Sequence, residues 1–129
     1  MPDIDILTLV KDIIRFIKVF RPKLAVVKHC RGDECNSASV IVTNLTNDPI
    51  TVLDVGFFFH GTHFTVDDTL FQPLSDRVEF PQTIKPRTPL SIRIGPGAFD
   101  VWKDADVYVT GLDRRRKLYK VKPHFAAAR

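Results

Sequence analysis

The sequence predicts a mainly β protein, an immunoglobulin-like β-sandwich of about seven strands with an added N-terminal amphipathic α-helix. Short β-branched and aromatic runs recur about every eight to twelve residues between turn residues. The stretch Val40 to Phe59 reads as two such strands joined by the turn Asn47-Asp48-Pro49. The first residues follow a helical period instead.

Residues 1–22 are predicted to contain the helix, which Asp3 caps and Pro22 ends. Apolar side chains occupy about half of its circumference, more than a helix with one neighbour needs. We therefore expect this face to bind a partner protein or a second copy, giving a homo-oligomer, unless the protein's own sandwich covers it. The partner-binding positions are Leu7, Val10, Ile13, Ile14, Ile17 and Phe20.

The sandwich is predicted over residues 23–123, followed by a frayed tail at 124–129. Alternation and turn residues place its strands in order along the chain. Ala98 to Ala105 is expected to form a helical turn carrying Trp102. The expected strands are Leu24–His29, Ser39–Asn44, Ile50–Phe59, Val78–Phe80, Leu90–Ile94, Asp106–Leu112 and Lys117–Lys122, with a further short one near His63–Val66.

The composition is that of an ordinary globular domain: 129 residues, 44% hydrophobic and 26% charged. Charged residues interrupt the N-terminal apolar run, which argues against a signal peptide and a transmembrane helix. We therefore expect a cytoplasmic protein with reduced thiols.

The order of these signals resembles that of small bacterial and phage-type proteins with a single immunoglobulin-like sandwich domain. The resemblance rests on residues 42–52 (VTNLTNDPITV), a Pro-rich approach to an alternating strand, and residues 106–110 (DVYVT). It departs at residues 85–89 (KPRTP), which are basic where such proteins often have an acidic turn. The resemblance implies a fold and no catalytic activity.

The short motif from Cys30 to Cys35 could form a disulfide across a loop that displays Arg31-Gly32-Asp33. The same cysteines could join His29, His60 or His63 in a metal site. His60 and His63 supply the second close ligand pair of such a site, but whether this pair meets the cysteines depends on the fold. The simpler interpretation is a polar loop with two thiols and scattered histidines, so we expect no metal.

The C-terminal region from Arg114 is basic, with seven Lys and Arg residues and no acid, while the whole chain has a net charge of +4. A basic strand could contact the phosphates of a nucleic acid, although a solubilising role is the simpler interpretation. The polar half of the N-terminal helix is less basic than membrane-surface helices tend to be, so we expect a protein contact there rather than peripheral membrane contact. The candidate phosphate contacts are Arg114, Arg115, Arg116, Lys117, Lys120 and Lys122.

No phosphate-binding loop, dinucleotide fingerprint, nucleophile elbow or zinc-protease motif occurs in the chain. We therefore expect a protein that is not an enzyme, with no cofactor and no evident small-molecule substrate. The leading hypothesis is a protein-interaction or assembly module that acts through the helix and the sandwich edge. The alternative is a basic nucleic-acid-associated protein.

Overall fold

The computed structural model describes residues 23–31, 38–67, 71–73 and 77–126. Strands dominate this part of the chain, and one short α-helix lies between β6 and β7. The elements are β1 (Leu24–Arg31), β2 (Ser39–Asn44), β3 (Ile50–Phe59), β4 (Thr62–Thr65), β5 (Gln82–Ile84), β6 (Pro89–Arg93), the 3-10 turn η3 (Pro96–Ala98), α2 (Phe99–Asp104), β7 (Asp106–Gly111), β8 (Arg116–Tyr119) and β9 (Pro123–Ala126).

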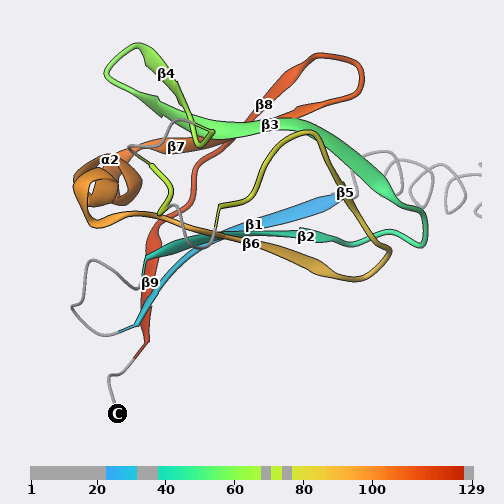
Figure 1. Ribbon diagram of the computed structural model, residues 1–129, viewed down its shortest axis with the longest axis horizontal. Coiled ribbons are helices and arrows are strands. Elements are labelled where there is room, and N and C mark those ends of the chain that lie inside the picture. The colour runs from blue at the N-terminus through green and yellow to red at the C-terminus, as the bar shows by residue number, and fades with distance from the viewer. Residues whose placement is uncertain (1–22, 32–37, 68–70, 74–76, 127–129) are drawn as a thin grey trace, which may run out of the picture.

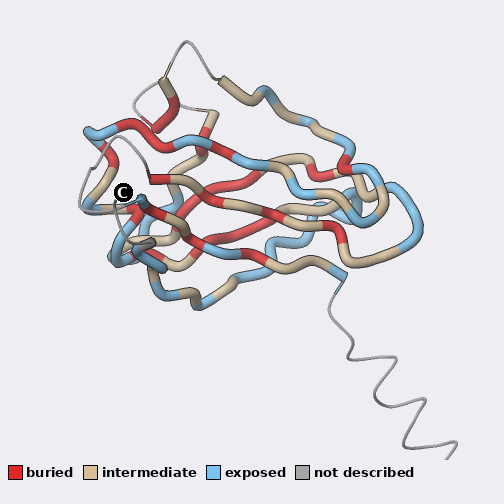
Figure 2. Tube along the Cα trace, turned by 90° about the horizontal axis from the view of Figure 1, so that it is seen from below, coloured by how far each residue is buried: buried red, intermediate tan, exposed pale blue. Residues whose placement is uncertain are grey.

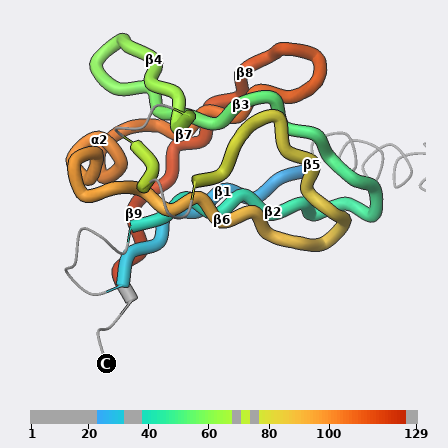
Figure 3. Tube along the Cα trace, in the orientation of Figure 1, coloured from blue at the N-terminus to red at the C-terminus, as the bar shows by residue number. Residues whose placement is uncertain are grey.

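The strands form two sheets that face each other (Figure 1). One has the order β6-β2-β1-β9, and the other has the order β4-β3-β7-β8, with β5 also paired to β3. All pairs are antiparallel except β1 with β9, which run parallel. The chain crosses between the sheets from β2 to β3, from β5 to β6, from β6 to β7 and from β8 to β9 (Figure 3).

Alternate residues of the strands fill the space between the sheets, as their period-two pattern requires. Buried segments therefore alternate with exposed ones along the strands (Figure 2). Helix α2 adds Trp102, which is fully buried and whose indole Nε1 donates to the Ser39 carbonyl oxygen at 3.0 Å. The main inward-facing residues are Val26, Val40, Val42 and Ile92 from one sheet, and Val52, Val55, Phe57, Val107 and Val109 from the other.

The turn between β2 and β3 is organised by the buried side chain of Asn44. Its Nδ2 donates to the carbonyl oxygens of Asp48 (2.7 Å) and Ile84 (3.0 Å). Its Oδ1 accepts hydrogen bonds from the main-chain N–H and the hydroxyl of Thr46, both at 2.8 Å. The Asn44 amide thus forms hydrogen bonds within the turn and one to β5, and a buried polar group with all its hydrogen bonds made can stabilise the fold.

The predicted mainly β class is confirmed, and β2 and β3 have the predicted bounds. The described residues contain nine strands where the sequence predicted about seven. Val78–Phe80 is not a strand, and β5 follows it instead. Residues 123–126 were expected in or beside the frayed tail, but they pair with β1 as β9. The predicted helix in residues 1–22 lies outside the described residues.

Candidate interaction surface

One side of the molecule leaves strand edges unpaired. β8 is the last strand of its sheet, and β9 pairs with β1 only from Lys28 onward. Within the described part of the chain, residues 24–27 and β8 therefore each have a neighbour on one side only. An unpaired edge presents main-chain N–H and C=O groups that can pair with another strand.

A hollow of about 720 Å³ opens beside these two edges, and we call it the edge hollow. Its walls come from the start of β1, the start of β3 and the β7–β8 hairpin. Leu24, Ile50 and Tyr119 line it as half-buried side chains, above the buried Val52 and Val109. This size is within the range of pockets that bind small ligands or peptide side chains.

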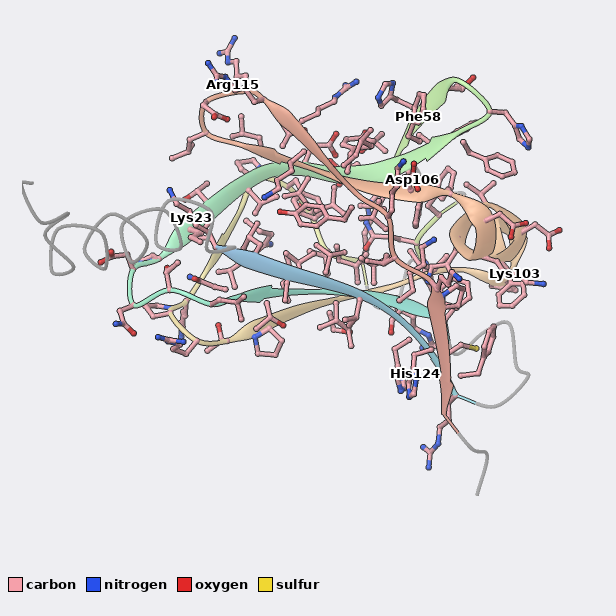
Figure 4. All side chains as sticks on the ribbon, turned by 180° about the vertical axis from the view of Figure 1, so that it is seen from behind. Lys23, Phe58, Lys103, Asp106, Arg115 and His124 are labelled. Atoms are coloured by element: carbon pink, nitrogen blue, oxygen red, sulfur yellow. The ribbon has the colours of Figure 1, made fainter. Side chains whose placement is uncertain are left out.

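The rim of the edge hollow is basic. Lys23 and Arg115 lie at the same end of the molecule (Figure 4). Arg116 and Lys117 also line the hollow, where Asp113 is the single acidic residue among those that the structure describes. None of these four cations forms an ion pair with a described residue. The rim therefore has a positive potential that an acidic ligand would neutralise.

Two of the cations lie against tyrosine rings. The Arg116 guanidinium is 4.9 Å from the ring centre of Tyr108, and the Lys117 Nζ is 5.4 Å from that of Tyr119. Both distances are within the range of cation–π attraction. Burial raises the pKa of the Tyr119 hydroxyl, so this group is neutral at physiological pH. The amine above the ring leaves Tyr119 covered on that side.

Tyr108 lies on the outer face of its sheet, yet only 1% of it is exposed. Its hydroxyl donates to Asp54 Oδ2 at 3.0 Å, and Asp54 Oδ1 accepts a hydrogen bond from the Thr65 hydroxyl at 2.6 Å. Burial, followed by the negative charge of Asp54 and the hydrogen bond to it, raises the pKa of Tyr108 to about 12. This cluster therefore lies on the outer face of the sheet, next to β8.

Gly56 makes room for that ring. A Cβ on Gly56 would lie 2.2 Å from the Phe64 carbonyl oxygen and 2.4 Å from the Tyr108 ring. The His63 ring covers Tyr108 edge-on, with 5.3 Å between ring centres. No local sequence pattern indicates this cluster, because its members come from three strands and meet only through the register.

A lysine is buried between the sheets. Lys28 is 1% exposed, points inward from β1, and donates through Nζ to the Ala105 carbonyl oxygen. Burial lowers the pKa of Lys28, while the nearby carboxylates of Asp106 and Asp104 oppose that shift. The sequence analysis did not single out this residue, since its inward alternation with Val26 and Cys30 was the only signal.

The six predicted phosphate contacts do not form one stripe. Arg115, Arg116 and Lys117 line the edge hollow. Arg114 lies in the hairpin turn, where its N–H donates to the Gly111 carbonyl oxygen. The remaining two, Lys120 and Lys122, line a different hollow next to α2, together with Lys103.

The other predicted positions are only partly described. Cys30 is buried in the core, and Cys35 lies outside the described residues, so the disulfide stays a prediction. Arg31 is exposed at the end of β1, whereas Gly32 and Asp33 are outside the described residues. The described residues contain no group of three or more side chains arranged to hold a metal ion.

The predicted partner-binding positions Leu7, Val10, Ile13, Ile14, Ile17 and Phe20 also lie outside the described residues. No helix in the described part of the chain is long and apolar enough to cross a membrane. No model of a known protein family matches the chain, and no curated protein sequence matches it either.

Proposed function

We propose that this protein is a non-catalytic interaction or assembly module, with an immunoglobulin-like sandwich as its scaffold. Its contact surface comprises residues 1–22 and the adjoining edge formed by β1 and β8. The immunoglobulin-like class is supported by the division of strands: β1, β2 and β6 in one sheet, and β3, β7 and β8 in the other, correspond to strands A, B, E and C, F, G of that fold. The pairing of β5 with β3 departs from it.

The observation that carries the proposal is the edge hollow between two unpaired strand edges. Leu112, which lines it from the hairpin, is 68% exposed, and Leu118, on the outer face of the unpaired strand β8, is 45% exposed. Residues 1–22 join the chain at Lys23, which lines this hollow. A hollow with an apolar floor and free main-chain edges, joined in sequence to an apolar segment, are features of a protein interface.

The test compares the two halves of the N-terminal segment. Ile14→Glu puts a charge on the predicted apolar half, and Thr8→Glu puts the same charge on the predicted polar half. We expect Ile14→Glu to reduce self-association or partner capture about tenfold or more, and Thr8→Glu to leave it within about twofold. The readout is molar mass by light scattering, together with capture from a cell lysate.

Circular dichroism and thermal unfolding of both variants establish that the strands remain folded. Equal association by the wild type and Ile14→Glu would overturn the role of residues 1–22. A monomer that captures nothing in its wild-type form would overturn the whole proposal.

Contact with nucleic acid is the second candidate, because the rim of the edge hollow is basic. Three of the six cations line the edge hollow, two line the hollow next to α2, and Arg114 lines neither, which gives nucleic-acid contact less support than a continuous track would. Tyr119, the aromatic ring among them, is covered by Lys117 and so offers little surface for base stacking.

A further inference from the structure

The pairing register identifies which main-chain groups of β8 face away from β7. The Gly111 N–H donates to the Arg115 carbonyl oxygen, which marks a hydrogen-bonded pair. Because such pairs alternate with non-bonded ones along antiparallel strands, Lys117 also bonds to β7. The N–H and C=O groups of Arg116 and Leu118 then point outward, where a further strand can pair with them.

We propose that the edge hollow binds an extended, acidic peptide segment of a partner protein, which pairs with β8 as an added strand. This inference rests on the proposed function and names the chemistry of the partner. Main-chain hydrogen bonds would hold the segment, and the rim and floor of the hollow would select its side chains.

The charge of the rim selects for acid. Among the described residues, four cationic ones and a single acidic one, Asp113, line the hollow, and none of the four cations forms an ion pair within that part of the chain. Lys117 faces into the hollow, and Arg116 faces the outer side of the sheet, where it lies over Tyr108. Because side chains of a strand alternate, a peptide beside β8 would meet a cation on both of its faces.

The floor of the hollow selects for at least one apolar side chain. Leu24, Ile50 and Tyr119 are each only partly buried, so an inserted aliphatic group would cover surface that is now exposed. Such burial is favourable in proportion to the area removed from water. The segment that fits is therefore acidic and contains apolar residues at alternate positions.

The chain itself does not supply this charge. Residues 1–22 contain four basic and three acidic side chains, and a second copy of the whole chain has a net charge of +4. Neither would neutralise the rim. The occupant is thus a different, acidic protein, while the apolar half of residues 1–22 remains for self-association.

The experiment uses the full chain and a labelled probe peptide of about six residues, the usual length of a strand, with alternating Glu and Val. Fluorescence anisotropy measures its affinity, with matched Gln-Val and Lys-Val peptides and an oligothymidylate as competitors. The rim variant is Arg115→Glu with Lys117→Glu. The control, Lys120→Glu with Lys122→Glu, makes the same charge change at the hollow next to α2.

We expect the Glu-Val probe to bind the wild type, the rim variant to weaken binding about tenfold or more, and the control to change it less than about twofold. Affinity should also fall with added salt. Equal affinity for the Gln-Val peptide, equal losses in both variants, or tighter binding of oligothymidylate would each overturn the inference.

A second readout needs no variant. Probe binding should slow amide hydrogen exchange at Arg116 and Leu118 and leave Lys117 unchanged, because only the first two N–H groups face outward. Unchanged exchange at both would exclude strand addition, even if the rim variant unfolds. The two proposals can fail separately. If Ile14→Glu loses self-association and the probe does not bind the wild type, the proposed module stands and this inference fails. If the probe binds and Ile14→Glu associates as the wild type does, this inference stands and the role of residues 1–22 fails.

Discussion

Tyr108→Phe should change the alkaline stability of the protein in a direction fixed by its hydrogen bond to Asp54. The pKa of Tyr108 rises from its ordinary value of 10.0 to about 12 in the folded protein. A raised folded pKa means that the unfolded chain loses its proton first as the pH increases. The hydroxyl therefore contributes fully to stability below pH 10, and this contribution is lost as the pH rises toward 12.

The size of the effect follows from the linkage relation, in which one pKa unit corresponds to about 1.4 kcal/mol. A shift of about two units gives an upper limit of about 2.7 kcal/mol, and half of this is lost by about pH 11. Solvent beside the outer face of the sheet screens the charge of Asp54, which makes both energies smaller than these limits. We therefore expect a loss of about 1 kcal/mol at about pH 11. At neutral pH, Tyr108→Phe should cost about 1–2 kcal/mol for the lost hydrogen bond to a carboxylate.

The assay is denaturant unfolding of the wild type and Tyr108→Phe between about pH 8 and 11.5. The difference between the two proteins cancels the contributions of other groups that titrate in this range. Absorbance titration in a Tyr119→Phe background reports the ionisation of Tyr108 alone, because the chain has two tyrosines. A stability difference that stays constant over this range would refute the reasoning, as would ionisation near pH 10 in the folded state.

Three other changes test the packing and the buried polar groups. Gly56→Ala should destabilise the fold by about 3 kcal/mol, because the added Cβ meets the Phe64 carbonyl oxygen and the Tyr108 ring. The control, Gly97→Ala, has nothing within 4 Å of the added Cβ and should cost under about 0.5 kcal/mol. Equal thermal unfolding of the two variants would contradict this. Asn44→Ala removes four hydrogen bonds and should lower the free energy of unfolding in denaturant by about 2–4 kcal/mol. The exposed control, Asn47→Ala, should lower it by under about 0.5 kcal/mol. A small effect at Asn44 would show that water replaces the amide. Lys28→Met should be within about 1 kcal/mol of the wild type at pH 7. Because the pKa of Lys28 is lowered from 10.5, the wild type should gain stability relative to Lys28→Met as the pH rises toward 10.5, and a flat difference would show that the amine is solvated.

Local patterns predicted the strands whose two faces differ clearly. β2 and β3 were found to the residue, because a β-branched run at residues 40–42 and a β-rich run from Ile50 are separated by the polar turn at residues 45–49. β5 was missed because its three residues, Gln82–Ile84, lie among prolines and have no alternation to detect. Its place depends on pairing with β3 and on the amide of Asn44, both remote in sequence.

The candidate site was less predictable, because it depends on where the chain leaves one sheet for the other. A continuous strand from Lys117 to Lys122 would place Lys120 and Lys122 on one face with Arg116 nearby, which is the stripe that the sequence predicted. β8 instead ends at Tyr119, and the chain crosses so that β9 pairs in parallel with the second half of β1. That crossing separates Lys120 and Lys122 from the rim of the edge hollow. It also leaves β8 and residues 24–27 each without a second neighbouring strand in the described part of the chain. The division of the positive charge and the free edges therefore have one cause, a strand pairing about a hundred residues apart in sequence, which no local pattern contains.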